Sequence, residues 1–101
     1  MKYCIIGTVG TAFFKNENFG IIVAPMINPY QEEEEEIFGL CIEGAAANEA
    51  VVILHKGNAD ECTKMMQHIT KQLLDGKQQI DIRSMAETNP AKVLKMIPKV
   101  D

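Results

Sequence analysis

The stretch from Asn58 to Gly76, NADECTKMMQHITKQLLDG, constrains the fold most, because it carries a full set of helix signals. The side-chain oxygen of Asn58 can cap the first turn. Glu61, three residues later, can bond back to the cap residue as in a capping box. Gly76 can adopt the left-handed conformation that closes a helix. We therefore predict one main helix over about residues 59–75.

One face of this helix is predicted to be apolar. Residues spaced alternately by three and four form a single stripe, which is typical of a helix that packs on a core; they are Ala59, Cys62, Met66, Ile69 and Leu73. The polar side chains between them are expected to face water. The helix is therefore predicted to cover one face of a sheet.

The chain before the helix is predicted to form the strands of that sheet. Residues 2–14 form one long strand or two short strands bent at Gly7–Gly10, since glycine in a strand pattern indicates a bulge or a close backbone approach. Residues 19–24 follow after a polar turn, and we expect them to pair with the first strand as a hairpin. Two further apolar segments, 37–43 and 50–55, complete the set before the helix.

Two shorter elements are predicted after the helix. In residues 78–83, isoleucine alternates with charged side chains, which indicates a half-exposed edge strand. Asn89 followed by Pro90 is a typical helix start, so a short C-terminal helix is expected over about residues 90–97.

The predicted fold is α+β, with an antiparallel sheet of four to six strands packed on one main helix in a single domain of residues 1–101. The predicted strands are apolar at consecutive positions. In a sheet with one solvent-exposed face, apolar and polar residues alternate along each strand. One long helix covers only one face. The sheet is therefore expected either to curl into a half-barrel or to bury its second face against another subunit. We predict a homo-oligomer, most simply a dimer.

Charge and composition exclude some classes of function. Five consecutive glutamates account for the formal net charge of −4. A single arginine and the absence of tryptophan argue against direct nucleic-acid binding. No apolar run reaches membrane-spanning length, and we see no signal peptide. The three cysteines lie in apolar patterns, as expected of reduced thiols in a cytoplasmic protein.

The acidic run is the first candidate site, made of Glu32, Glu33, Glu34, Glu35 and Glu36. Adjacent carboxylates repel one another and favour a solvated loop. Alternatively, the run is a docking surface for a basic protein partner. A cation site is a third reading, although hard cations prefer carboxylates that converge from spaced positions.

The glycine-rich bend is the second candidate site. Its ligand-binding residues would be Gly7, Thr8, Gly10 and Thr11, whose backbone N–H groups and hydroxyls could hold a phosphate. A phosphate loop normally leads into a helix, whereas strand-like AFF follows here. A structural bend is the alternative interpretation.

No catalytic, metal or cofactor site is predicted. The spacings of His55, His68 and Cys62 fit no zinc pattern. Cys62 lies on the buried stripe, where a thiol is inert. An enzyme would require a convergent polar cluster that a linear reading does not reveal.

The segment VVILHKGNADECTKMMQHITKQLLDGK, residues 51–77, resembles small uncharacterised proteins of Firmicute bacteria and their phages, in which several strands precede one helix. The resemblance implies no activity and no site residues, but it favours an accessory protein of a mobile element. We therefore expect a small non-enzymatic binding or regulatory protein, such as a phage inhibitor that associates stoichiometrically through the acidic run. The alternative is an oligomer that binds or sequesters a nucleotide-type ligand near Gly7–Thr11.

Overall fold

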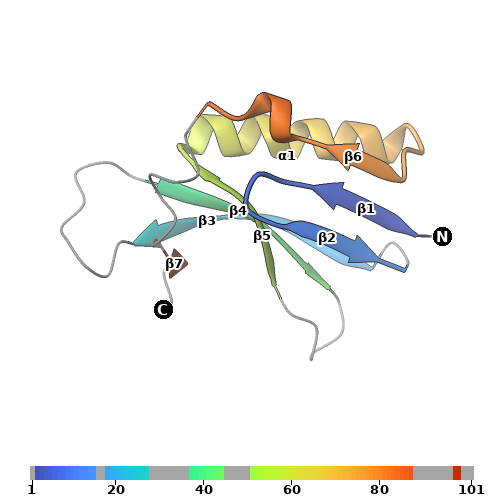
Figure 1. Ribbon diagram of the computed structural model, residues 1–101, viewed down its shortest axis with the longest axis horizontal. Helices are drawn as coiled ribbons and strands as arrows, with labels where there is room; N and C mark the ends of the chain where they lie inside the picture. The colour runs from blue at the N-terminus through green and yellow to red at the C-terminus, as the bar shows by residue number, and fades with distance from the viewer. Residues whose placement is uncertain (1, 16–17, 28–36, 45–50, 88–96, 99–101) are drawn as a thin grey trace.

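Figure 1 shows the computed structural model, which describes residues 2–15, 18–27, 37–44, 51–87 and 97–98. The class is α+β with one main helix, as predicted. The elements in chain order are β1 (Tyr3–Ile6), β2 (Thr11–Phe14), β3 (Phe19–Ile27), β4 (Ile37–Gly44), β5 (Val52–Gly57), α1 (Ala59–Leu74), β6 (Gln79–Asp81), a single 3₁₀ turn η1 (Arg83–Met85) and β7 (Ile97–Pro98).

Asn58 caps the first turn of α1 and Gly76 closes its last turn, as the sequence predicts. The backbone N–H of Glu61 donates to Asn58 Oδ1 at 2.8 Å, which satisfies one of the free donors of the first turn. Gly76 has a φ of 83°. Its N–H donates to the carbonyl of Leu73 at 3.0 Å, and the N–H of Lys77 donates to that of Gln72 at 2.9 Å. This pair of bonds is a Schellman motif.

The strands form two sheets, not the one predicted antiparallel sheet. The orders are β2-β1-β6 and β5-β4-β3-β7. Residues 2–14 fold back on themselves at Gly7–Gly10, so β1 pairs with β2, and β3 pairs with β4. The predicted hairpin between residues 2–14 and 19–24 is therefore wrong. The late strand β6 lies at a sheet edge as predicted, but it runs parallel to β1.

The predicted C-terminal helix lies mostly outside the described residues. Its last position, Ile97, belongs to β7 instead of a helix, and it pairs with Ile27 of β3. Among the described elements, no helix has the length and apolar character needed to cross a bilayer.

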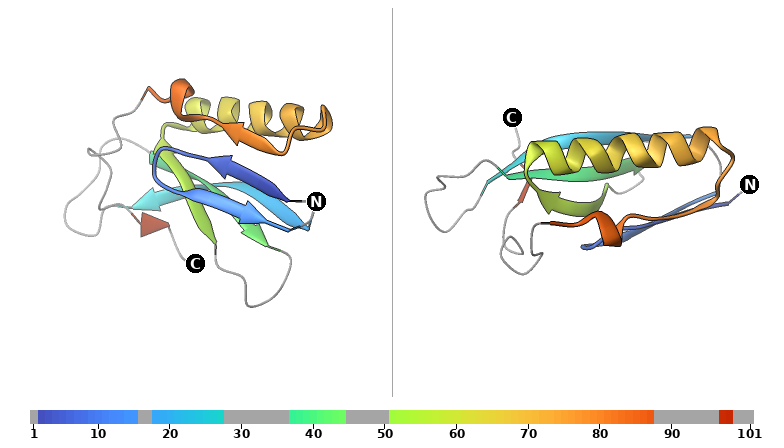
Figure 2. Two further views of the ribbon diagram at one scale, coloured as in Figure 1. Left: turned by 45° about the vertical axis from the view of Figure 1, so that its right-hand side comes forward. Right: turned by 90° about the horizontal axis from the view of Figure 1, so that it is seen from above.

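The main core lies where α1 meets both sheets. In the right-hand view of Figure 2, α1 lies over β4, with β3 along one side of the helix and β1 and β6 on the other. Most of the predicted helical stripe is buried or packs against this core, whereas Ala59 at the first helical position is exposed. The buried core residues are Ile5, Ala12, Leu40, Ile42, Leu54, Cys62, Met65, Ile69, Ile80 and Ile82.

The face of the larger sheet that points away from α1 is partly covered by the chain itself. Met26 and Ile37 are buried there and form a second small cluster with the half-buried Ile53. Ile22 is 39% exposed. This face therefore combines a small buried cluster with some exposed apolar surface, and the predicted homo-oligomer stays a prediction.

Candidate functional site

Three polar side chains that are distant in sequence meet inside the molecule. Thr8 lies in the β1–β2 turn, His55 in β5 and Glu61 in the first turn of α1. Thr8 Oγ1 lies 2.5 Å from His55 Nδ1, and His55 Nε2 lies 2.5 Å from Glu61 Oε1. We call this arrangement the Thr8–His55–Glu61 network. His55 is fully buried and Glu61 is 3% exposed, whereas Thr8 is half-buried.

A β-bulge in β5 brings His55 into this position. Leu40 of β4 pairs with His55 and Cys41 pairs with Ile53, so Leu54 is an extra residue in the ladder. Strict alternation would place the neighbours Leu54 and His55 on opposite faces of the sheet. The bulge relaxes this rule, so Leu54 joins the main core while His55 reaches Glu61 of α1.

Two glycines hold the β1–β2 turn against β5. A Cβ at Gly7 would collide with the backbone of Leu54, and one at Gly10 would lie 2.7 Å from the carbonyl oxygen of Ile53. The N–H of Val9 donates to the carbonyl of Leu54 at 2.8 Å. The close backbone approach that the sequence indicated is therefore correct, and it fixes Thr8 beside His55.

Glu61 is held from several directions. The N–H of Glu87, which follows η1, donates to Glu61 Oε1 at 2.9 Å. The positive end of the α1 dipole also favours a carboxylate in the first turn. Gly57 leaves room for the pair, because a Cβ there would lie 2.8 Å from His55 Nε2 and 2.9 Å from Glu61 Oε2. The network therefore joins the hairpin turn, β5, α1 and the chain after η1.

The direction of proton donation in the network depends on the tautomer of His55. With the imidazole proton on Nε2, His55 donates to Glu61 and its Nδ1 accepts from the Thr8 hydroxyl. This order of hydroxyl, imidazole and carboxylate is the order found where a base activates a nucleophile. No buried side-chain nitrogen or oxygen of the described residues lacks a hydrogen-bond partner.

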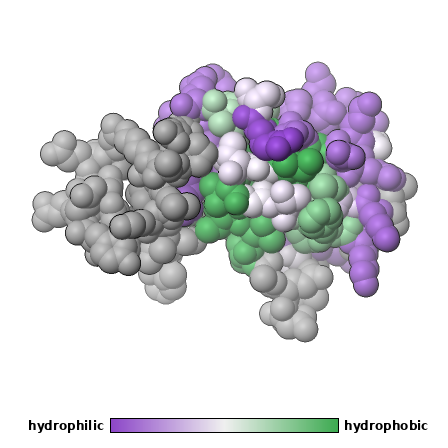
Figure 3. Space-filling view, in the orientation of Figure 1, coloured by the Kyte–Doolittle hydropathy of each residue, from purple (hydrophilic) through white to green (hydrophobic). Residues whose placement is uncertain are grey.

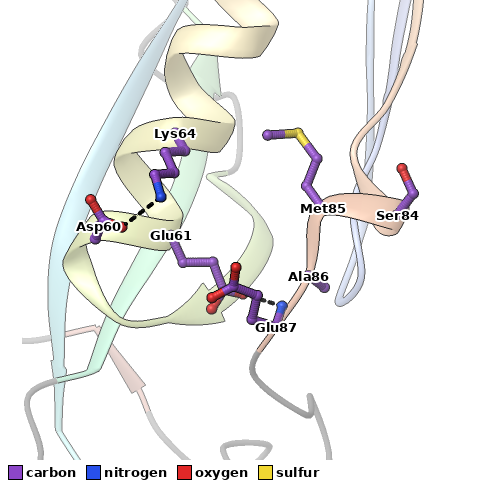
Figure 4. Close-up of a pocket in the computed structure, with 7 residues that line it drawn as sticks. All are labelled: Asp60, Glu61, Lys64, Ser84, Met85, Ala86 and Glu87. Carbon is purple, nitrogen blue, oxygen red and sulfur yellow. Dashed lines mark hydrogen bonds and ion pairs between the residues drawn. The ribbon is translucent and has the colours of Figure 1, made fainter.

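A pocket lies on the α1 side of the network (Figure 4). Its volume is about 320 Å³, and its lining residues are Asp60, Glu61, Lys64, Ser84, Met85, Ala86 and Glu87. Lys64 and Asp60 form an exposed ion pair at 3.0 Å. The hydrogen bond from this pair raises the pKa of Lys64. The pocket is therefore bordered by carboxylates, but its lysine is already paired.

Cys62 and His68, which the sequence analysis considered as a nucleophile and as metal ligands, both lie on α1. Burial, and to a lesser extent the charge of Glu61, raises the pKa of Cys62 to about 11, so this thiol stays protonated. His68 is half-buried on α1. Within the described ranges, no group of three potential ligands is arranged to hold a metal ion.

The open end of the β1–β2 hairpin is the second notable surface. Phe13 is 74% exposed on β2. Beside it lies a pocket of about 320 Å³ lined by Lys2, Tyr3, Phe13, Phe14 and Lys15. We call these five residues the hairpin end. In Figure 3, hydrophobic side chains gather over the hairpin and β5, and hydrophilic ones border them.

Phe19 of β3 packs against two aromatic residues of the hairpin end. The ring of Phe14 stacks on Phe19 with centroids 4.6 Å apart, and Tyr3 meets Phe19 edge-on at 5.7 Å. A second pocket of about 380 Å³ lies on the other side of Tyr3, between Phe19 and Leu74. Leu74 is 83% exposed. The sequence contained one signal for this surface, because neighbouring Phe13 and Phe14 in a strand must point to opposite faces.

The two sequence-predicted sites have different outcomes. Glu32–Glu36 lie outside the described residues. Gly7, Thr8, Gly10 and Thr11 lie together at the hairpin turn, where two of the polar groups expected to hold a ligand form hydrogen bonds within the protein. Gly7 N–H donates to the carbonyl of Gly10 at 2.9 Å, and Thr8 bonds His55.

Comparisons of the chain with models of protein families, with curated proteins and with solved structures find no match.

Proposed function

We propose that this protein acts by stoichiometric association with another protein and that the hairpin end is its contact surface. The observation that carries the proposal is Phe13, a large apolar side chain left 74% exposed on an edge strand. Beside it lies a pocket between aromatic side chains. Exposed apolar surface of this kind marks interaction sites, and aromatic residues near pockets contribute most to binding energy.

The orientation of the β2 backbone supports a particular mode of binding. In an antiparallel pair, successive residues alternate between bonding the partner strand and pointing outward. Gly7 bonds Gly10 across the turn, whereas Cys4 directs its N–H away from β2, to the carbonyl of Gln78 at 2.7 Å. Phe13 pairs with Cys4, so its own N–H and C=O point to the outer edge of β2. A partner strand added there would bond this edge.

Charge favours an acidic occupant. The described residues that line the pocket at Phe13 include two lysines, Lys2 and Lys15, and no carboxylate. Complementary charge at the rim of an interface guides association and selects partners. The proposed partner is therefore an extended protein segment in which large apolar side chains alternate with aspartate or glutamate.

A peptide-display selection tests this proposal directly. The purified protein is the bait, and Phe13→Ser is the counter-bait, because this variant keeps the buried faces of the hairpin. We expect enriched peptides with alternating acidic and apolar residues whose affinity falls at least about tenfold for Phe13→Ser and for Lys2→Glu/Lys15→Glu. Enriched peptides that bind Phe13→Ser equally well, or no enrichment, would overturn the proposal. Light scattering identifies the remaining outcome, in which a second copy of the chain covers Phe13.

The acidic run extends the same proposal to a second contact. Five adjacent carboxylates, Glu32–Glu36, suit a basic protein surface. Replacement of all five by glutamine should weaken capture of the selected partner and make that capture less sensitive to salt. Capture that is unchanged in strength and salt dependence would restrict the contact to the hairpin end.

A further inference from the structure

We propose that the Thr8 hydroxyl is a base-activated nucleophile that accepts a small acyl group from an activated ester or thioester. This inference concerns a covalent reaction and does not depend on the proposed binding function. It rests on the Thr8–His55–Glu61 network, in which a hydroxyl, an imidazole and a carboxylate are joined by two contacts of 2.5 Å. A nucleophile within reach of a base that a third group orients is the recurring arrangement of covalent catalysis.

Burial differs along the network in the way this chemistry requires. His55 and Glu61 are shielded from water, whereas Thr8 is half-buried and its neighbour Val9 is 38% exposed. Thr8 is therefore the least buried of the three residues in the network, and the base is fully buried behind it. The Thr8 hydroxyl has a second possible acceptor in the carbonyl of Leu54 at 3.5 Å. The much shorter contact to His55 Nδ1 directs its proton to the imidazole.

The reaction balances without a further cofactor. Thr8 Oγ1 attacks the acyl carbonyl carbon and forms a new C–O bond, while its proton passes to His55 Nδ1. The tetrahedral intermediate then collapses, the bond to the leaving alkoxide or thiolate breaks, and His55 returns the proton to the leaving group. The products are an ester on Thr8 and an alcohol or thiol.

Glu61 is a positioning residue in this scheme. Its carboxylate accepts from His55 Nε2, which keeps Nδ1 as the acceptor for the hydroxyl and stabilises the imidazolium formed during the attack. The N–H of Glu87 holds the same carboxylate oxygen at 2.9 Å. Because the turn around Thr8 lies directly against the backbone of β5, we restrict the acyl class to small groups such as acetyl.

The probe is p-nitrophenyl acetate, with release of p-nitrophenolate and peptide mapping by mass spectrometry as readouts. We expect one acetyl group mapped to Thr8. Thr8→Ala should lose this modification, and Thr8→Ser should keep it with a faster rate because the hindering methyl group is gone. Thr11→Ala is the matched control, since Thr11 is an exposed hydroxyl of the same hairpin, and it should leave the modification of Thr8 unchanged.

Glu61→Gln separates a catalytic arrangement from a purely structural one. Glutamine keeps the shape of the side chain but cannot stabilise the imidazolium, so acetylation of Thr8 should slow by roughly 10²-fold while the circular dichroism spectrum stays native. Thr8 that remains unmodified in the unaltered protein, or that is acetylated no faster than Thr11, would overturn the inference. If Glu61→Gln does not fold, the comparison of Thr8, Thr8→Ser and Thr11 still decides it.

Discussion

The two ends of the β1–β2 hairpin differ in what they bury. At the turn, Thr8 bonds the buried His55, which in turn bonds the carboxylate of Glu61, a residue that is 3% exposed. At the open end, Phe13 is 74% exposed. One end therefore places polar groups in the interior, and the other places a large apolar group in water. Both arrangements cost free energy. We infer from the difference that the turn anchors the hairpin, whereas its open end is available for contact.

The buried network has an architectural consequence beyond the hairpin. A buried carboxylate is costly to desolvate, and it is retained where good hydrogen bonds satisfy it. Here the carboxylate of Glu61 bonds His55 of β5 and the N–H of Glu87. The network thus connects both sheets and the helix at one point. Variants at the turn should therefore act on stability, and variants at the open end should act on association.

The largest expected effect is that of Glu61→Ala. This change leaves the buried His55 without the acceptor of its Nε2 proton, which costs about 1–3 kcal/mol. The backbone N–H of Glu87 loses its acceptor as well, which adds to the loss. Urea denaturation followed by circular dichroism measures the loss. The control is Asp60→Ala, which removes the neighbouring carboxylate from an exposed pair with Lys64. Equal loss in the two variants would show that burial does not distinguish the network from surface pairs.

A smaller loss is expected for Gly7→Ala. The new Cβ would collide with the backbone of Leu54, and overpacking of this kind costs about 1–3 kcal/mol. Gly20→Ala in β3 is the matched control, because a Cβ there has no neighbour within 4 Å among the described residues. It should be neutral or slightly stabilising. Unfolding midpoints of both variants test the close approach of the turn to β5, which would be refuted if the two midpoints agreed.

The adjacent phenylalanines of β2 sharpen the comparison within a single strand. Phe14→Ala removes a half-buried ring stacked on Phe19, so we expect a loss of roughly 1–3 kcal/mol, below the 3–5 kcal/mol of a fully buried ring. Phe13→Ala should change stability by no more than about 0.5 kcal/mol while it weakens binding of the selected peptides. Thermal unfolding and peptide affinity are measured on both variants. A Phe13→Ala variant that is less stable than Phe14→Ala would contradict the assignment of Phe14 to stability and Phe13 to binding.

The helix was predictable because its signals are local. Asn58 and Gly76 act within one turn of α1, so the sequence alone places both ends. The division into two sheets was not predictable from local signals. The strand pairing depends on whether the first hairpin turns at Gly7–Gly10 or after Phe14, and both places carry turn-forming residues.

The network was missed for a different reason. Thr8 and His55 are 47 residues apart, and the bulge at Leu54 that turns His55 toward α1 leaves no pattern in the sequence. Glu61 was assigned only to the helix cap, although its side chain also bonds His55. Thr8 was selected, but for a ligand site. The sequence thus supplied each of the three residue types without the contact that gives them a common role.

The smallest expected effect concerns the exposed pair of Asp81 and Arg83 at the end of β6. The hydrogen bond from the Arg83 side chain, followed by that from its backbone N–H, lowers the pKa of Asp81 from 3.8 to about 2. A carboxyl whose pKa is lowered in the folded state stabilises the fold above pH 3.8, and this contribution is lost as the pH falls toward 2. An NMR titration of the Asp81 carboxyl should therefore show its pKa rising toward 3.8 in Arg83→Ala. An unchanged value in that variant would assign the shift to the backbone bond alone. Because both side chains are exposed, salt should screen this pair, whereas the buried pair of His55 and Glu61 should be insensitive to salt.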